Sequence, residues 1–595
     1  MQPTMEVLAK LNQNSQKHSN EVFTRLYRYL LREDIYYVAY KNLYANSGAG
    51  TKGIDNDTAD GFSEQYVKNI IKKLSNGNYR PKPVRRVYIE KSNGKRRPLG
   101  LPTFTDKLVQ EVLRMILEAV YEPIFLDCSY GFRPNKGCHM ALTKIKREFN
   151  GTMWFIEGDI KGCFDNINHN RLIEIISNKI RDERFLQLIR KFLSSGYMED
   201  WQYNKTYSGC PQGGIISPIL SNIYLHELDK FVQNLKVEFD KPATRKFTPE
   251  YDKISSRVKV LVRRMKKAKT TEERNKLVDE WRIARKQLLK TPSKSQTDKK
   301  LKYVRYADDF LIGVNGSKED CENLKAKLHD FIGKNLKMEM SDEKTYITHS
   351  NTPARFLGYD IKIRRNSQTK PGTHGRTQRT MSYTTELTVP FERIEKFLFN
   401  KKAVFMKNGK MFPCKRTTLV NLTDLEILNS FNSEIRGICN YYTLAANYGK
   451  LNYFSYLMEY SCLKTIAAKH GSTIRKILDK YKDGQGGWAI PYETKGKIQK
   501  MNISSYKTCS GNKIIKDDIV NATLYHQHST TSFESRLKAK QCELCGTTKS
   551  DCYEVHHINK VKNLQGKTIW EQIMIAKNRK TLVVCKECHI KIHNN

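Results

Sequence analysis

The chain lacks any long apolar stretch. No hydrophobic run approaches the roughly 20 residues needed to cross a bilayer, and the first residues, Met-Gln-Pro-Thr-Met-Glu-Val, lack the apolar core of a signal peptide. Internal repeats and low-complexity tracts are absent as well. We therefore expect a soluble protein without a membrane partner, located in the bacterial cytoplasm or inside an organelle.

Acidic residues are scarce relative to basic ones. The chain has 62 Asp and Glu residues and 104 Lys and Arg residues, which gives a net charge of +42 spread along the whole chain. Such an excess indicates a polyanionic partner, most simply a nucleic acid, with an anionic membrane surface as the alternative. The length of 595 residues predicts several domains.

Two adjacent carboxylates end the motif at residues 303–309, Tyr-Val-Arg-Tyr-Ala-Asp-Asp, and an apolar run follows it. The pattern predicts a strand, a two-residue turn at Asp308-Asp309 and a returning strand. A third carboxylate, Asp159, ends another apolar strand-like run. Two Mg²⁺ ions about 4 Å apart, held by such carboxylates, are suited to phosphoryl transfer. The alternative is an ordinary acidic hairpin turn.

Three further motifs suit a nucleotide site. Phe164 follows Asp159 closely and is a candidate for sensing the 2′ position of a sugar, with core packing as an equal alternative. Gln212 lies in the turn Pro-Gln-Gly-Gly, where backbone can approach a ligand. The basic segment 85–98 predicts a hairpin that clamps phosphates, or else a solvated basic turn.

The C-terminal region holds paired cysteines at metal-ligand spacing. Eight of the fourteen cysteines are scattered singly through the first 470 residues and are expected to be buried small hydrophobes. By contrast, Cys542, Cys545, Cys585 and Cys588 form two CxxC units, which predicts a structural Zn²⁺ site rather than disulfides.

Histidines near these cysteines resemble the HNH nuclease pattern. In that pattern His557 is the general base, and His556 and His593 hold a divalent metal such as Mg²⁺, with His589 a weaker candidate. The position of the middle Asn is occupied by Lys580, so that residue of the motif is unassigned. A zinc knuckle that only binds DNA is the alternative.

Secondary structure follows from periodicity and turn residues. Residues 1–70 look helical with a Gly-rich break at 47–53, residues 105–126 form a helix, and residues 237–300 are expected to form a charged helical hairpin whose second helix starts at Thr270. Residues 388–480 look mainly helical, and residues 481–535 polar and irregular.

Seven segments, taken in order, resemble the group II intron-encoded proteins, meaning reverse transcriptases and maturases with a C-terminal HNH endonuclease domain. The segments begin at Arg97, Tyr130, Gly158, Pro211, Tyr306, Ser341 and Phe356. The resemblance implies an α+β multidomain fold, namely a right-hand polymerase of fingers, palm with an antiparallel sheet, and helical thumb, plus a small zinc-containing ββα-metal domain. The resemblance divides the chain into five parts. They are an RNA- and template-binding extension (1–80), fingers and palm (81–375, with an insertion at 237–300), thumb and maturase domain (376–480), DNA-binding region (481–540) and HNH domain (541–595).

The resemblance also implies the roles of individual residues. Asp159, Asp308 and Asp309 would bind Mg²⁺, Phe164 would sense the sugar, and Lys91 and Arg97 would meet the triphosphate of a dNTP. Gln212 would lie beside the template–nucleotide pair.

The implied function is RNA-directed DNA polymerisation coupled to splicing and mobility of the intron. The protein would bind its own intron RNA as a ribonucleoprotein, assist splicing, and nick target DNA so that the freed 3′-OH primes cDNA synthesis on the nucleoid. A maturase acting only as a splicing factor and a free-standing reverse transcriptase are the alternatives. The sequence leaves open the intron, the DNA site, the bases read by residues 481–540, the nuclease metal and the oligomeric state.

Overall fold

The computed structural model describes most of the chain. Described are residues 3–18, 20–46, 48–90, 94, 96–200, 202–210, 213–242, 247–293, 298–365, 368–372, 377–379, 383–484, 487–494, 496–511 and 533–594. Lys91 and Gln212 lie outside the described residues. Among the helices that are described, none is both long enough and apolar enough to cross a bilayer.

A five-stranded sheet forms the centre of the molecule, with the strand order β10-β5-β9-β8-β4. Its strands are β4 (Ser129–Tyr130), β5 (Trp154–Gly158), β8 (Lys300–Tyr306), β9 (Asp309–Asn315) and β10 (Tyr346–His349). The neighbours pair antiparallel, except that β4 runs parallel to β8. Strand β9 is apolar and buried because helices cover the sheet on both faces.

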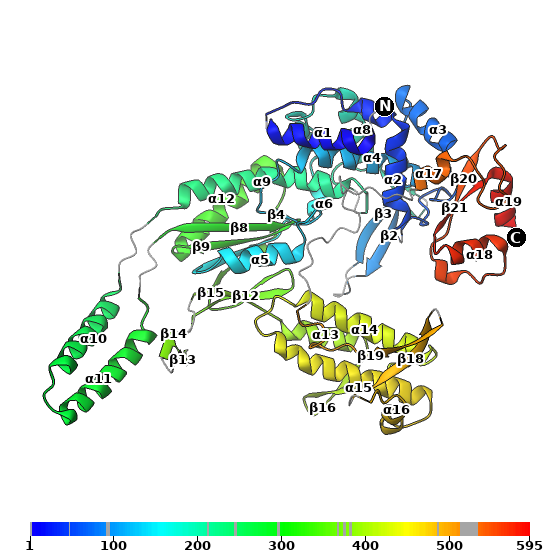
Figure 1. Cartoon of the computed structure of the whole chain (residues 1–595). Coiled ribbons are helices and arrows are strands. Elements are labelled where there is room, and N and C mark those ends of the chain that lie inside the picture. The colour runs from blue at the N-terminus through cyan, green and yellow to red at the C-terminus, as the bar shows by residue number, and fades with distance from the viewer. Residues whose placement is uncertain are drawn as a thin grey trace.

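The covering helices come from separate parts of the sequence. Helices α9 (Ser217–Phe239) and α12 (Lys318–Leu336) pack on one face, and α5 (Cys138–Glu148) packs on the other (Figure 1). Helix α4 (Phe104–Tyr121), which the periodicity of residues 105–126 predicted, contacts α9 and the N-terminal helices.

The turn between β8 and β9 lies one residue earlier than the sequence predicted. Tyr306 pairs with Asp309, so the two turn residues are Ala307 and Asp308, and the expected Asp308-Asp309 turn was wrong. Ala307 has a φ of +53°. Its N–H donates to the Tyr130 carbonyl at 3.0 Å, and its own carbonyl accepts from the Arg305 guanidinium at 2.8 Å. These tertiary contacts hold an alanine in a backbone conformation that local preference disfavours.

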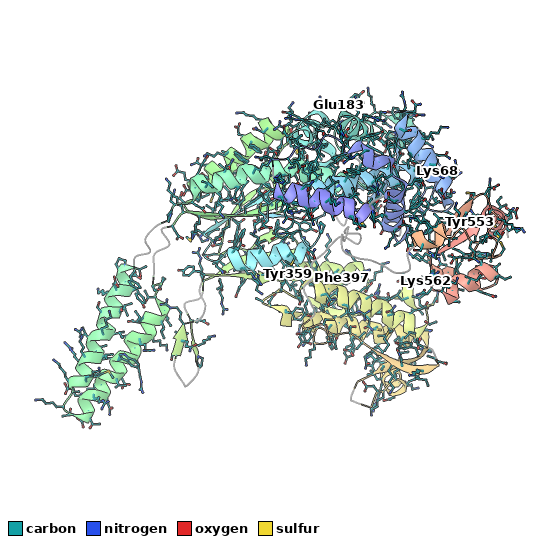
Figure 2. All side chains as sticks on the ribbon, turned by 45° about the horizontal axis from the view of Figure 1, so that its top comes forward. Lys68, Glu183, Tyr359, Phe397, Tyr553 and Lys562 are labelled. Atoms are coloured by element: carbon teal, nitrogen blue, oxygen red, sulfur yellow. The ribbon has the colours of Figure 1, made fainter. Side chains whose placement is uncertain are left out.

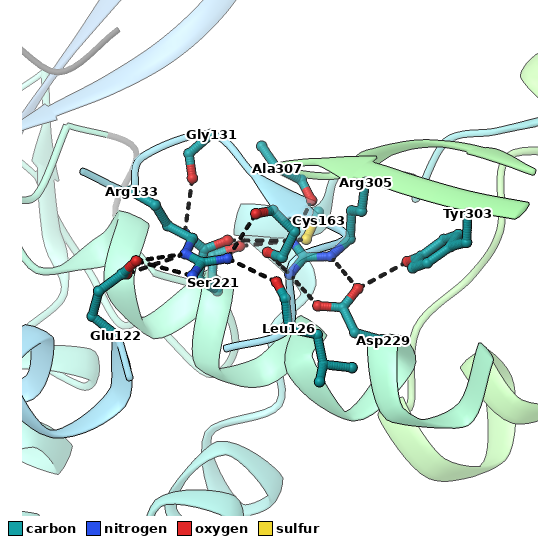
Figure 3. Close-up of polar contacts among 12 residues, drawn as sticks. Glu122, Leu126, Gly131, Arg133, Cys163, Ser221, Asp229, Tyr303, Arg305 and Ala307 are labelled. Atoms are coloured by element: carbon teal, nitrogen blue, oxygen red, sulfur yellow. Dashed lines mark hydrogen bonds and ion pairs between the residues drawn. The ribbon is translucent and has the colours of Figure 1, made fainter. Parts of the chain in front are cut away.

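A buried ion pair lies beneath this turn (Figure 3). The side chains of Arg305 and Asp229 are both fully buried, and the guanidinium donates to the two carboxylate oxygens at 2.7 and 2.6 Å. The remaining donors of Arg305 reach Asn222, Ser129 and the Ala307 carbonyl. The Tyr303 hydroxyl donates to the same carboxylate at 2.9 Å. Helix α9 and the β8–β9 hairpin are thereby fixed to one another.

The N-terminal region is helical, as expected, and a basic hairpin follows it. The helices are α1 (Thr4–Lys17), α2 (Glu33–Tyr44) and α3 (Glu64–Ser75). Strands β2 (Val84–Glu90) and β3 (Arg96–Leu101) pair antiparallel, which confirms the hairpin predicted within residues 85–98. They belong to a four-stranded sheet of order β3-β2-β6-β7, with β6 (Tyr197–Glu199) and β7 (Gln202–Asn204).

The charged insertion forms the expected helical hairpin. Helices α10 (Pro249–Lys267) and α11 (Thr271–Lys290) pack together and extend away from the body (Figure 1). The Thr270 hydroxyl caps α11 by accepting from the Glu273 N–H at 3.3 Å. At the other end, the Arg379 guanidinium donates to the carbonyls of Leu288, Leu289 and Thr291. A short ribbon of β13 (Thr369–Pro371) and β14 (Thr377–Arg379) is thus attached to α11.

The region after the central sheet begins with a small sheet, β11 (Ala354–Phe356), β12 (Tyr359–Arg364) and β15 (Thr384–Thr388), and continues as helices. These are α13 (Phe391–Asn400), α14 (Asp424–Tyr441), α15 (Leu451–Lys469) and α16 (Ile474–Lys480). Two hairpins were not predicted, β16–β17 (Val404–Lys407 and Lys410–Pro413) and β18–β19 (Ala489–Thr494 and Lys497–Asn502). The irregular structure expected for 481–535 was therefore wrong over β18–β19, whose start is held by the Trp488 indole donating to Glu459 at 3.0 Å.

The C-terminal unit packs against the N-terminal region. It contains α17 (Phe533–Lys538), β20 (Tyr553–His557), α18 (Ile569–Ala576), β21 (Thr581–Cys585) and α19 (Lys586–Asn594). Strand β1 (Phe62–Ser63) pairs with β20, so a three-stranded sheet of order β1-β20-β21 joins the two ends of the chain. Strand β1 also contacts α3, so the N-terminal helices and the C-terminal unit adjoin each other through β1 (Figure 2).

We predict that Asp229→Ala weakens the β8–β9 hairpin by about 3–5 kcal/mol, because the mutation leaves the Arg305 charge buried without its partner. Hydrogen–deuterium exchange of peptides from β8 and β9 measures this local free energy. The control is Glu227→Ala on the same helix, which removes a surface pair with Lys230 and is worth at most about 1 kcal/mol. Equal protection in the two variants would contradict the prediction.

Candidate active sites

Three carboxylates meet at one end of the central sheet. Asp159 follows β5 directly, and Gly158 pairs with Phe310, the residue after Asp309. A side chain at Gly158 would clash with the Phe310 ring, its Cβ lying 2.0 Å from that ring, so β5 and β9 require glycine here. The register brings Asp159 within hydrogen-bonding reach of Asp309. Asp308, in the turn, completes the group that the sequence predicted.

The electrostatics of this group suit a divalent cation. Loss of hydration and the charges of Asp308 and Asp159 raise the pKa of Asp309 to about 7. Burial raises the pKa of Asp308 most, and the charge of Asp159 raises it further. Each raised pKa indicates that the protein alone compensates the negative charge of that carboxylate poorly. Oxygen ligands with excess negative charge are what Mg²⁺ prefers, so these residues fit the expected ions.

Two basic side chains face the carboxylates. Lys344, in the short helix at Asp342–Lys344, makes an ion pair with Asp159. Arg97 is exposed on β3, and its charge lowers the pKa of Asp308, against the larger effect of burial. The predicted triphosphate-binding Arg97 is thus near the carboxylates. Lys344 had no assigned role, although the segment that begins at Ser341 was among those resembling the family.

Phe164 borders the same region. It lies in the short helix α6 (Cys163–Asn166), is half-buried, and meets the exposed Phe132 edge-on with ring centroids 6.3 Å apart. Because the ring is only partly buried, core packing stays the alternative for this residue. Beside the undescribed Gln212, Gly213 has a φ of +103°, and a Cβ there would lie 2.6 Å from the Gly100 carbonyl oxygen. The sequence predicted that the backbone of this turn can approach a ligand closely. In the structure, the backbone at Gly213 approaches strand β3.

The four C-terminal cysteines form one cluster. Their sulfurs all lie within 4.8 Å of one another, and the Sγ atoms of Cys545 and Cys585 are 3.8 Å apart. An edge of about 3.8 Å is what a tetrahedron with Zn–S bonds of about 2.3 Å requires. Burial alone would raise the pKa of Cys542, but backbone N–H groups of Cys545 and Cys585 lower it to about 7. The cluster fits a zinc site.

The histidines also form one cluster, with a residue that the sequence did not reveal. His556, His589 and His593 each have a nitrogen within 4.8 Å of the others and of a carboxylate oxygen of Asp60. Burial would lower the pKa of His589, but its contacts with Asp60 and Glu554 raise it to about 9. His589 is as close to the centre as His556 and His593, although the sequence ranked it as the weaker candidate. No local signal pointed to Asp60, which precedes His556 by almost the whole chain.

The expected general base lies beside this cluster. His557 ends β20, and its Nε2 lies 2.9 Å from the Tyr44 carbonyl oxygen. Lys580, at the position of the missing Asn, donates from Nζ to the Ala45 carbonyl at 3.1 Å. Both contacts are made to the end of α2, so the N-terminal region lines this site.

The aromatic residues of the helical region divide into two groups. Tyr442 and Phe454 are buried, and Tyr441 is half-buried and donates to the Leu357 carbonyl, so these residues serve packing. Tyr453 and Tyr456 on α15 are 40% and 46% exposed. The latter two are available to stack on a ligand.

Family models match three parts of the chain. They are described as reverse transcriptase (RNA-dependent DNA polymerase), matching residues 89–241 and 281–361, type II intron maturase, matching 382–535, and AI2M/AI1M-like HNH endonuclease, matching 542–589.

Relatives match along almost the whole chain. The group II intron-encoded protein LtrA of Lactococcus lactis subsp. cremoris is 56% identical over 593 residues, covering 99% of each chain. An uncharacterized 91 kDa protein in the cob intron of Schizosaccharomyces pombe is 37% identical, covering 99% of this chain and 72% of its own. A putative COX1/OXI3 intron 1 protein of Saccharomyces cerevisiae is 33% identical, covering 99% and 71%. The chain therefore belongs to the group II intron-encoded proteins, and it is a reverse transcriptase with intron maturase and HNH endonuclease domains.

Proposed function

We propose that the protein copies its own group II intron RNA into DNA at a target site that its nuclease has nicked. The observation that carries this proposal is the meeting of Asp159, Asp308 and Asp309 at one end of the central sheet, with Arg97 and Lys344 beside them. Two Mg²⁺ ions at these carboxylates would activate the primer 3′-OH and stabilise the leaving pyrophosphate.

The elements take the parts of a right-hand polymerase in this proposal. The central sheet with α5, α9 and α12 is the palm, the β2–β3 hairpin belongs to the fingers, and α13–α16 form the thumb. Arg97 and Lys91 hold the triphosphate of a dNTP, Phe164 lies against its sugar, and Gln212 contacts the template–nucleotide pair. The ring of Phe164 is only partly buried, which supports this role.

Intron RNA is the partner of the thumb and of the N-terminal extension. Arg436 on α14 and the rings of Tyr453 and Tyr456 on α15 are exposed, which supports contacts to phosphates and bases. The region 481–540 binds the target DNA. The net charge of +42 supports two polyanionic partners on one chain.

The C-terminal unit cuts the DNA strand whose 3′ end becomes the primer. His557 would accept the proton of the attacking water, while His556, His589 and His593 would hold a divalent ion, Mg²⁺ or similar, able to stabilise negative charge on the leaving 3′ oxygen. Cys542, Cys545, Cys585 and Cys588 would hold a zinc ion, which would join the first turn of α19 to the loop before β20 and so help to position the histidines.

Asp308→Ala is expected to abolish primer extension, because it removes a ligand of the polymerase ions, and to leave intron RNA binding and splicing intact. Primer extension on an RNA template and a splicing assay measure the two functions separately. The control is Asp330→Ala, a surface residue of α12 paired with Lys334. Appreciable synthesis by Asp308→Ala would refute the site, and loss of splicing would refute the separation of functions.

Phe164→Ala is expected to relax sugar selection, since the ring no longer excludes a 2′-hydroxyl. The ratio of kcat/KM for a dNTP over the matching rNTP should fall by about 10–200-fold, the range that steric pocket contacts supply. The control is Phe399→Ala, which removes a partly exposed ring from α13. An unchanged ratio in Phe164→Ala would show that the ring serves packing alone.

Cys585→Ser is expected to lower the zinc content of the purified protein and to abolish strand nicking, because a thiolate ligand is lost. Primer extension should persist. Mass spectrometry of the metal measures zinc, and Cys552→Ser, which changes a cysteine outside the cluster, is the matched control. Full zinc content in Cys585→Ser would refute the assignment.

A further inference from the structure

We propose that the nuclease centre is composite, with Asp60 of the N-terminal extension as a ligand of its metal ion. This inference rests on the proposed assignment of His556, His589 and His593 to the same ion. The HNH family match covers residues 542–589, so Asp60 lies outside it. The nuclease would then depend on a part of the chain that precedes the polymerase.

The segment that carries Asp60 is held firmly against the C-terminal unit. Phe62 and Ser63 form β1 and pair with Val555 and Glu554 of β20, and the Gly61 N–H donates to the Val555 carbonyl at 3.0 Å. The buried Phe62 ring stacks on Tyr40 with centroids 4.1 Å apart, and Phe533 of α17 lies 5.8 Å from it. Strand pairing and this aromatic cluster fix the backbone beside Asp60.

The same segment is tied to the polymerase side of the molecule. The Lys107 ammonium donates to the carbonyls of Gly48 and Thr51, at 3.2 and 2.9 Å. Asp57 accepts from the Thr105 N–H at 2.8 Å. Residues 48–63 therefore run from α4 to the nuclease sheet with contacts at both ends.

The carboxylate of Asp60 points into the histidine cluster. One oxygen lies 2.7 Å from His593 Nε2, and the other lies 3.2 Å from both His589 Nε2 and His556 Nδ1. The second oxygen also accepts from the backbone N–H of His557 at 2.7 Å. Three imidazoles from β20 and α19 thus converge on one carboxylate, the donor set that Zn²⁺, Ni²⁺ and similar ions take.

His556 supplies independent support for an ion at this place. Its side chain is about nineteen-twentieths buried, with a relative exposure of 6%. Its Nδ1 lies 3.2 Å from an Asp60 oxygen, but neither ring nitrogen makes a hydrogen bond of acceptable geometry. A buried polar group without a partner costs about 1–3 kcal/mol, and buried polar groups in proteins are rarely left in that state. A metal ion between His556, His589, His593 and Asp60 would give Nδ1, the nitrogen that faces Asp60, a partner.

His589 is prepared as a ligand by a second carboxylate. Its Nδ1 lies 2.6 Å from Glu554, a residue of β20, and its Nε2 faces the centre. A carboxylate that accepts the outer N–H of a ligating histidine fixes the ring and its tautomer. His593 Nε2 lies 3.2 Å from His589 Nε2, so both nitrogens are close enough to bind the same ion.

The N-terminal extension also orients the general base. A carbonyl oxygen only accepts hydrogen bonds, so His557 carries its proton on Nε2, toward Tyr44, and leaves Nδ1 free to accept a proton from water. Lys580, at the position of the middle Asn, donates to the Ala45 carbonyl just after the same helix. The end of α2 thus supplies the contact that fixes this imidazole.

The first test measures Ni²⁺ affinity by calorimetry on full-length, zinc-loaded protein, with Asp308→Ala present throughout to remove polymerase-site binding. Asp60→Asn should weaken Ni²⁺ binding by at least about 10-fold, since loss of a group that supports the ion typically costs 10–100-fold. Asp55→Asn is the matched control, because Asp55 lies on the same loop and faces Lys82. An effect of Asp60→Asn no larger than that of Asp55→Asn would overturn the proposal.

His593→Ala separates this inference from the assignment on which it rests. Loss of Ni²⁺ binding in His593→Ala together with unchanged binding in Asp60→Asn overturns the role of Asp60 alone. Unchanged binding in both variants overturns the proposed nuclease site itself.

Asp60→Cys distinguishes ligation from docking of the segment. If residue 60 binds the ion, a thiolate there will add cadmium–thiolate absorption in the ultraviolet on titration with Cd²⁺, beyond that of the protein with Asp60. A residue that only anchors β1 would add none. Absence of the added absorption overturns the proposal even if Asp60→Asn weakens Ni²⁺ binding.

Discussion

The guanidinium of Arg305 is fully buried, and its five N–H donors are satisfied only because Asp229, Asn222, Ser129 and the Ala307 carbonyl surround it. Two of these partners come from α9 and one from β4, so the group ties the β8–β9 hairpin to the helix beneath it. A buried charge tolerates little displacement, since each lost partner leaves an unsolvated donor. The position of Asp308 and Asp309, and with it the polymerase chemistry, depends on this constraint.

The second organising feature is the contact between the two ends of the chain. Pairing of β1 with β20 places Tyr44, Ala45 and Asp60 beside the nuclease histidines, while residues 48–57 remain attached to α4. The small C-terminal unit shares one hydrophobic core with the N-terminal helices instead of standing alone. Such packing gives the polymerase and the nuclease a fixed geometry on one chain.

Prediction from sequence succeeded where the signal is local. The periodicity of residues 105–126, the cap at Thr270 and the spacing of the CxxC pairs each specify structure within a few turns of chain. The predicted position of the β8–β9 turn was wrong by one residue, because Ala307 takes a positive φ that contacts with the distant Tyr130 and with Arg305 stabilise. Lys344 and Asp60 received no role, since their partners lie 185 or more residues away.

The sequence by itself determined the chemistry available to this protein: three carboxylates at or next to apolar strand-like runs, four cysteines at zinc spacing, an HNH-like set of histidines, and an excess of positive charge. Those features are local in the chain or follow from composition. Only the tertiary structure decided which groups face one another, such as Lys344 with Asp159, Arg305 with Asp229, and Asp60 with His556, His589 and His593. The physical reason is that such contacts come from sheet register and helix packing between distant segments, and burial gives them their strength.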